Sequence, residues 1–198
     1  MSKNLHLAAL ITLGVAFALL LTVQYVPWGG HKEEGTTPGG FPGGGIAYET
    51  SMVVTLWGLD FRSENDFGGG ASDEGWYSDV WSEDGETPDG LASIRAGVPL
   101  VLVATVLAGV AVALHALRYG NAAGTVGLAG GLLGIVGAVL FANGVSELFE
   151  PIKVTWGVGL VLGILGLVAL VAGAVMAMVL PDDHAAPTAR PATRVDFD

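Results

Sequence analysis

The sequence predicts an all-α membrane bundle of four transmembrane helices, with a small extracellular β-sheet in the first loop. The composition is too apolar for an ordinary soluble domain, because 52% of the 198 residues are hydrophobic and only 14% are charged. Four apolar segments reach the length of about 20 residues that a helix needs to cross the hydrocarbon layer. A long acidic segment with tryptophans and β-branched residues separates the first of them from the second.

The four apolar segments carry almost no charge. None contains Asp, Glu or Lys, and their single arginine, Arg95, lies at the end of a segment. Backbone amides in lipid must bond within their own segment, so we expect helices at residues 5–26, 94–117, 122–142 and 154–180. The first is interpreted as an uncleaved anchor rather than a signal peptide, because its end has no small-residue cleavage site.

These helices predict a multi-pass protein of the cell membrane. Lys and Arg are divided almost evenly between the two sides, so Lys3 and the great length of the first loop decide the orientation. Both features favour termini on the inside. The expected segments are 1–26 with the first helix, 27–93 as an acidic extracellular loop, 94–117 as the second helix, 118–121 as a cytoplasmic turn, 122–142 as the third helix, 143–153 as a short extracellular loop, 154–180 as the fourth helix and 181–198 as a disordered cytoplasmic tail.

The net charge of −11 comes from the first loop. Between residues 27 and 93, thirteen Asp and Glu residues outnumber Lys32 and Arg62 by eleven. Such a surface repels nucleic acid, which we exclude as a partner, and it is typical of a halophilic organism. The carboxylates at 64–86 form either a calcium site or a solvated acidic face, and the lack of regular ligand spacing favours the acidic face. We therefore predict no metal and no cofactor.

Two parts of the acidic loop have strand character. Residues 46–61 are rich in Tyr, Val, Thr, Leu and Trp, and residues 76–81 alternate between two faces, so a hairpin is expected. Trp28 is expected at the lipid headgroups, and the glycine- and proline-rich stretch that follows Gly30, through Gly45, is expected to be mobile. The residues expected to order the hairpin and to contact a partner are Trp57, Trp76 and Trp81.

Small residues recur at spacings of three and four along the third and fourth helices. Such a face lets helix backbones approach closely where lipid removes the hydrophobic driving force. Two interpretations remain open, a surface for self-association or a partner and packing inside this bundle. The residues concerned are Gly127, Gly131, Gly159 and Gly163.

Two histidines lie toward the same side of the predicted membrane. His6 is near the start of the first helix and His115 is near the end of the second. Imidazoles from neighbouring helices can ligate a haem iron, although a single histidine near a helix end more often reaches the interface. The chain has no cysteine, no spaced Ser, His and Asp grouping and no phosphate-binding loop, so no enzyme is expected.

The arrangement resembles the claudin and peripheral myelin protein superfamily of four-helix membrane proteins. The local matches are Trp28 soon after the first helix, the Trp57-Gly58-Leu59 segment, and Arg95 at the start of the second helix. The resemblance implies a small sheet in the first extracellular loop and a general adhesive or accessory role. The paired loop cysteines of that family are absent from this chain.

These observations predict a non-enzymatic membrane protein that acts as a structural, adhesive or accessory subunit. Its outer loop and glycine-rich helices are expected to contact the lipid bilayer and either other membrane or envelope proteins or a second copy of the chain. The alternative is a small subunit of a membrane redox or transport complex that holds haem between His6 and His115.

Overall fold

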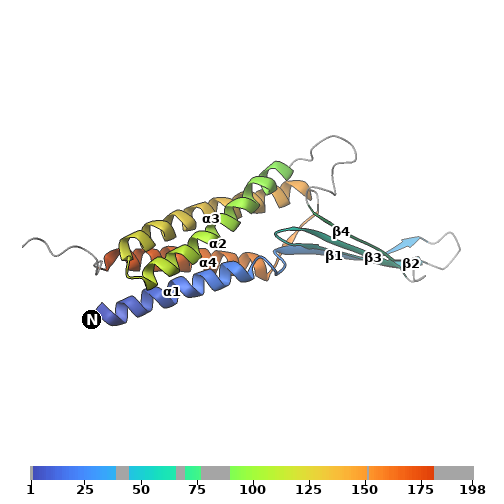
Figure 1. Ribbon diagram of the computed structural model, residues 1–198. Helices are drawn as coiled ribbons and strands as arrows, with labels where there is room; N and C mark the ends of the chain where they lie inside the picture. Colours follow the sequence, from blue (N-terminus) through green and yellow to red (C-terminus); the bar gives the residue numbers. More distant parts are fainter. Residues whose placement is uncertain (1, 39–44, 66–69, 77–89, 151, 181–198) are drawn as a thin grey trace, which may run out of the picture.

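The computed structural model describes residues 2–38, 45–65, 70–76, 90–150 and 152–180. This part of the chain forms four helices and a five-stranded antiparallel sheet, and each helix is long and apolar enough to cross a membrane. The helices are α1 (Ser2–Thr22), α2 (Leu91–Ala116), α3 (Gly120–Leu148) and α4 (Val158–Val179). The strands are β1 (Gly29–Pro38), β2 (Gly45–Val54), β3 (Gly58–Asn65), β4 (Gly70–Trp76) and β5 (Thr155–Trp156) (Figure 1).

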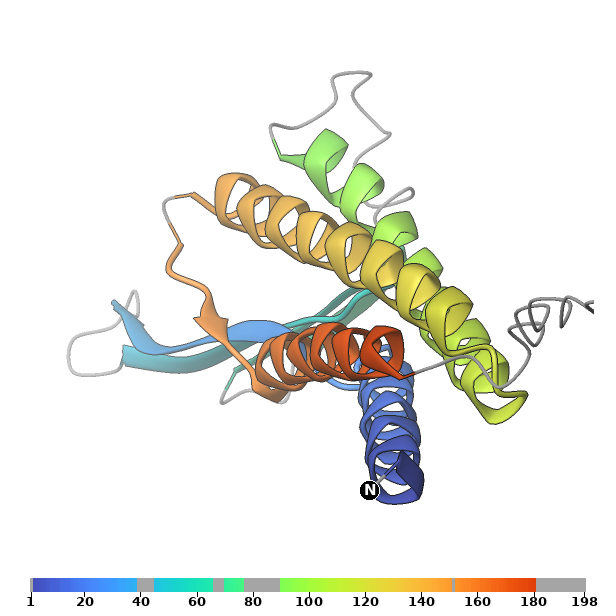
Figure 2. The same cartoon turned by 90° about the vertical axis from the view of Figure 1, so that its left-hand side faces the viewer.

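The helices form a bundle with the sheet at one end. Helix α3 packs against α2 and α4, and α1 packs mainly against α4 and α2. The sheet extends beyond one end of the bundle, whereas the N-terminus and the turn between α2 and α3 lie at the other end (Figure 1). Figure 2 looks at the bundle from that second end, with the strands behind the helices. The molecule is therefore elongated, with its two ends built from different elements.

The four helices confirm the predicted number but differ from the prediction at their ends. Helix α3 continues to Leu148, past residue 142, where the sequence prediction ended it. A carbon added at Gly144 would lie 2.8 Å from Cγ1 of Ile94, so this extra part of α3 packs tightly on α2. Helix α4 begins at Val158 rather than at residue 154, because the residues before it pair with the sheet.

The sheet has the order β4-β3-β2-β1-β5. The predicted strand at 46–61 is wrong as a single strand, because the chain reverses at Thr55 and forms the β2–β3 hairpin. The hydroxyl oxygen of Thr55 accepts hydrogen bonds from the backbone N–H groups of Trp57 and Gly58, at 3.3 and 3.0 Å. Such a side-chain bond favours a turn over a continued strand. Of the predicted strand at 76–81, Trp76 ends β4, and 77–81 lie outside the described residues.

The expectation of a mobile stretch after Gly30, through Gly45, is also wrong as far as Pro38, where β1 ends. This strand pairs with β2 from Gly29 to Pro38. Its glycines allow a close approach, since a carbon added at Gly30 would lie 2.6 Å from the backbone oxygen of Met52. Glycine in a strand marks either flexibility or a tight backbone contact, and composition alone does not distinguish the two.

The two faces of the sheet differ in chemistry. Side chains alternate along each strand, so Met52 and Val54 of β2 share one face, and both are buried. We call this the apolar face. The other face, which we call the polar face, carries exposed side chains that include Lys32, Glu34 and Glu49. Next to the bundle, the sheet therefore packs with the apolar face and leaves the polar face to solvent, whereas farther along β1 the exposed Glu33 stands on the same face as Met52.

Candidate functional site

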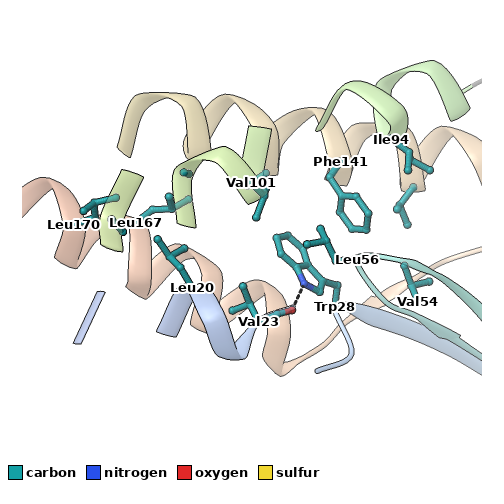
Figure 3. Close-up of a cluster of buried hydrophobic side chains, with 14 of the residues drawn as sticks. Leu20, Val23, Trp28, Val54, Leu56, Ile94, Val101, Phe141, Leu167 and Leu170 are labelled. Atoms are coloured by element: carbon teal, nitrogen blue, oxygen red, sulfur yellow. Dashed lines mark hydrogen bonds between the residues drawn. The ribbon is translucent and has the colours of Figure 1, made fainter. Parts of the chain in front are cut away.

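Trp28 joins the sheet to the helix bundle. Its side chain is only 1% exposed, and its indole N–H donates a hydrogen bond of 2.8 Å to the backbone oxygen of Val23 (Figure 3). The ring meets Phe141 of α3 edge to face, with centroids 4.9 Å apart. The expected position of Trp28 at the lipid headgroups is therefore wrong, because the ring lies inside the protein.

The hydrophobic core continues from the helices into the sheet. Val54 at the end of β2 and Leu56 in the following turn are fully buried, in the same cluster as Trp28 and Phe141 (Figure 3). Ile94 of α2 lies in this cluster too, also fully buried. The sheet and the bundle thus share one core, which makes the sheet an extension of the helices rather than a tethered loop.

Backbone hydrogen bonds add to this junction. The amide of Trp28 bonds to the oxygen of Val54, and the amide of Gly157 bonds to the oxygen of Trp28, both at 2.8 Å. The amide of Gly159 bonds to the oxygen of Pro27 at the same distance. A carbon added at Gly159 would lie 2.6 Å from that oxygen. Gly159 therefore lets the start of α4 close on the segment that leads into β1.

The other predicted tryptophans occupy different positions. Trp57 lies in the β2–β3 turn, is 36% exposed and donates an indole hydrogen bond of 2.8 Å to the backbone oxygen of Gln24. It thus connects the turn to the residues just after α1. The backbone of Trp76 pairs with Gly58, and Trp81 lies outside the described residues. Arg95 is exposed on the first turns of α2, at the bundle end next to the sheet.

Charged side chains on the polar face form one compact group. Lys32 Nζ lies 2.8 Å from a carboxylate oxygen of Glu34 and 3.0 Å from one of Glu49. Glu34 and Glu49 stand opposite each other on β1 and β2, so the lysine separates two like charges. The hydrogen bond and the charge of Lys32 hold the pKa of Glu34 below its ordinary value. The same two carboxylates raise the pKa of Lys32.

The outer edge of β1 is only partly covered. β5 pairs with Gly29 and Gly30 alone, although β1 continues to Pro38. In the described part of the chain, no other strand pairs with this edge. An uncovered edge presents backbone N–H and C=O groups to solvent, and charged residues such as those of β1 limit uncontrolled pairing there.

The predicted small residues of the helices lie at contacts within this chain. A carbon at Gly127 would lie 2.9 Å from Cβ of Ala174 in α4, and one at Gly131 would lie 2.7 Å from Cγ2 of Val171. Gly163 faces Trp28, with the nearest ring carbon 3.5 Å from an added carbon. These contacts correspond to the interpretation of packing inside the bundle.

The structure brings His6 and His115 together, as their positions in the sequence suggested. Their ring centroids are 5.4 Å apart and the ring planes are tilted by 36°. Nε2 of His115 lies 3.1 Å from the backbone oxygen of His6. An iron bound through that nitrogen would break this contact. Among the described residues, no group of three or more His, Cys, Asp or Glu side chains could hold a metal ion.

The sequence reasoning missed the junction of sheet and bundle. It placed Trp28 at the membrane interface and did not identify β5. A usable signal was present, because Trp28 is followed directly by Gly29 and Gly30, and a large ring beside two glycines suits a tight crossing of chain segments. The pairing of β5 with β1 joins segments more than 120 residues apart, which local pattern does not reveal.

No protein-family model matches the chain, and a search of curated proteins finds no match.

Proposed function

We propose that this chain is a non-enzymatic, multi-pass protein of the cell membrane that presents its sheet outside as a rigid adhesive or accessory platform. The burial of Trp28 is the observation that supports the proposal most. A sheet held through a shared core keeps its orientation to the helices, so a partner bound to the sheet is held at a defined position relative to the membrane. A freely tethered loop has no such fixed orientation, and it would lose conformational entropy on binding.

The outward surfaces of the helices support placement in a bilayer. Large apolar side chains are exposed on all four helices, and a soluble monomer rarely exposes so large an apolar area. Examples are Ile11, Val106, Leu132 and Val168. Lipid is the solvent that covers such side chains without cost.

The sheet supports the role of a platform for a protein partner. Its polar face is charged and exposed, and the outer edge of β1 is open beyond Gly30. A partner can use either feature, through charge complementarity or by adding a strand to the edge. A sheet in the first loop is also what the resemblance to the claudin superfamily implies, and membership of that superfamily remains a proposal.

Single cysteines test the orientation, because the natural chain has none. We expect Ser72→Cys, on the exposed surface of β4, to react with an impermeant thiol reagent in intact cells. Asn121→Cys, at the start of α3 and at the other end of the bundle, is expected to react only after the cells are opened. The reverse pattern would place the sheet on the cytoplasmic side.

Photocrosslinking in native membranes tests the platform. A photoreactive amino acid at Ser72 is expected to give a discrete protein adduct, whereas the same residue at Ile11 of α1 should react mainly with lipid. Trp28→Ala should abolish the Ser72 adduct while the protein stays in the membrane, because the sheet then loses its fixed position. An adduct that persists unchanged in Trp28→Ala, or no protein adduct from the sheet, contradicts the proposal.

A further inference from the structure

A cavity with basic walls lies at the end of the bundle opposite the sheet. Its volume is about 310 Å³, and it is formed by the start of α1, the end of α2 and the residue after Leu117. Among the lining residues that the structure describes, every charged or titratable side chain is basic and the others are apolar. The residues that decide its chemistry are Lys3, His6, Leu7, Leu10, His115 and Arg118.

The two histidines of the cavity have unused hydrogen-bonding capacity. His115 is only 3% exposed, and its Nε2 lies 3.1 Å from the backbone oxygen of His6. A carbonyl oxygen only accepts, so Nε2 is the nitrogen that carries hydrogen. Nδ1 of His115 and Nδ1 of His6 are both buried without a hydrogen-bond partner in the described part of the chain. Buried polar atoms in native proteins nearly always have a partner, so two beside one cavity indicate a missing ligand.

Arg118 occupies an uncommon backbone position at the edge of the cavity. Its φ is +70°, a left-handed conformation in which helices usually end with glycine. The amide of Tyr119 bonds to the oxygen of Leu114 and so closes the end of α2 around Arg118. Although the chain has 31 glycines, the residue at this left-handed position is an arginine and not a glycine. An unfavourable backbone conformation of this kind is found more often at functional sites.

We propose that this cavity binds a phosphate group with net negative charge, supplied by the headgroup of an anionic lipid. The two permanent cations, Lys3 and Arg118, repel a metal ion and attract an anion. Nδ1 of His115 carries no hydrogen when Nε2 does, so it accepts a hydrogen bond from a hydroxyl group of such a headgroup. Basic pockets between helix ends on the cytoplasmic side suit such headgroups, and Leu7 and Leu10 suit the apolar part of the same molecule. The inference rests on the membrane orientation proposed above and is independent of any partner of the sheet.

Lipid binding to the purified full-length chain in neutral detergent tests this proposal. Native mass spectrometry would follow titrations with phosphatidylglycerol, with zwitterionic phosphatidylcholine, and with inorganic phosphate as competitor. The test variant is Lys3→Gln with Arg118→Gly, which removes two charges and gives the left-handed position its preferred residue. The matched control is Arg95→Gln, which removes an exposed arginine of α2 at the opposite end of the bundle.

Phosphatidylglycerol should bind the natural chain more tightly than phosphatidylcholine. The double variant should lose affinity for phosphatidylglycerol roughly 25-fold, about fivefold for each charge, whereas Arg95→Gln should keep it. Failure of inorganic phosphate to compete identifies the lipid as the source, and competition at millimolar concentration identifies free phosphate in the same site. Equal binding of the two lipids, or an equal loss in Arg95→Gln, overturns the proposal. Neither result depends on the crosslinking of the sheet.

Discussion

Two contacts hold this molecule together by opposite means. Between α2 and α3 the backbones touch, because a carbon added at Gly97 would lie 2.6 Å from the oxygen of Gly137, and one added at Gly137 would lie 2.8 Å from the oxygen of Gly97. We call this the glycine contact. Between the sheet and the bundle, one large ring, that of Trp28, fills the space against Phe141. We call this the tryptophan contact.

The difference follows from what surrounds each contact in the proposed membrane setting. Helices in lipid gain nothing by hiding apolar surface from one another, so they associate through close van der Waals contact, which small residues permit. The sheet meets water and is held by burying a large apolar ring, which stabilises the junction by a few kcal/mol. The glycine contact should therefore fail when atoms are added, and the tryptophan contact should fail when atoms are removed.

The largest expected effect is that of Trp28→Ala. Removing a fully buried tryptophan costs about 4 kcal/mol, and here the loss falls on the junction. Hydrogen exchange should therefore become faster in β1 and β2, with much less change in α2 and α3. Equal acceleration in the sheet and the helices would mean that the two regions unfold as one unit, and the distinction between the contacts would fail.

The glycine contact is tested by Gly97→Ala. The added methyl carbon meets the backbone of α3 at Gly137 and Phe141, which cannot move aside as a flexible side chain can, so we expect a loss of about 2 kcal/mol. The measurement is the melting temperature in detergent. Gly14→Ala is the matched control, because nothing lies within 4 Å of a carbon added there. A helix favours alanine over glycine, so this control should melt at the same temperature or higher.

A smaller effect is expected at Trp57, the second connection between sheet and bundle. Trp57→Phe keeps an aromatic ring in the β2–β3 turn but removes the indole hydrogen bond to Gln24. The expected cost is about 1 kcal/mol, visible as faster proteolysis in the sheet. If Trp57→Phe loosens the sheet as much as Trp28→Ala does, the junction does not depend mainly on the buried ring.

The smallest effect is expected from Lys32→Gln on the polar face. Glu34 has a lowered pKa in the folded chain, so its ion pair with Lys32 stabilises the fold above the ordinary carboxyl pKa of 4.5. This contribution is lost as the pH falls through the lowered pKa. The variant should therefore melt slightly lower than the natural chain at pH 7, and the two should converge in strong acid or at high salt.

Arg62→Gln is the comparison for Lys32→Gln, since the Arg62 Nε to Asp60 distance is 3.8 Å and that pair is looser. It should change the melting temperature less at pH 7. If the difference in melting temperature between Lys32→Gln and the natural chain stays the same in strong acid, the effect does not come from the Glu34 carboxylate.

The sequence by itself determined the four helices, because the length of an apolar run is a local property that lipid or a core must satisfy. It also indicated strand-forming residues between the first two helices and placed His6 and His115 toward one end. The sequence predicted the ends of the helices less accurately than their number. Residues 143–148 carry no strong signal, and they became helical because Gly144 fits against α2.

Only the tertiary structure decided how the sheet is built and attached. β1 was expected to be mobile, because glycines alone do not distinguish a flexible segment from a close backbone contact. The pairing with β2 decides for the contact, since a carbon added at Gly30 would lie 2.6 Å from the backbone oxygen of Met52. Trp28 was expected at the membrane interface, but its ring is buried inside the protein, where it packs against Phe141 of α3. The two unpartnered histidine nitrogens likewise arise from contact between α1 and α2. Each of these features depends on atoms that are distant in the chain, and such pairings are fixed by packing rather than by local preference.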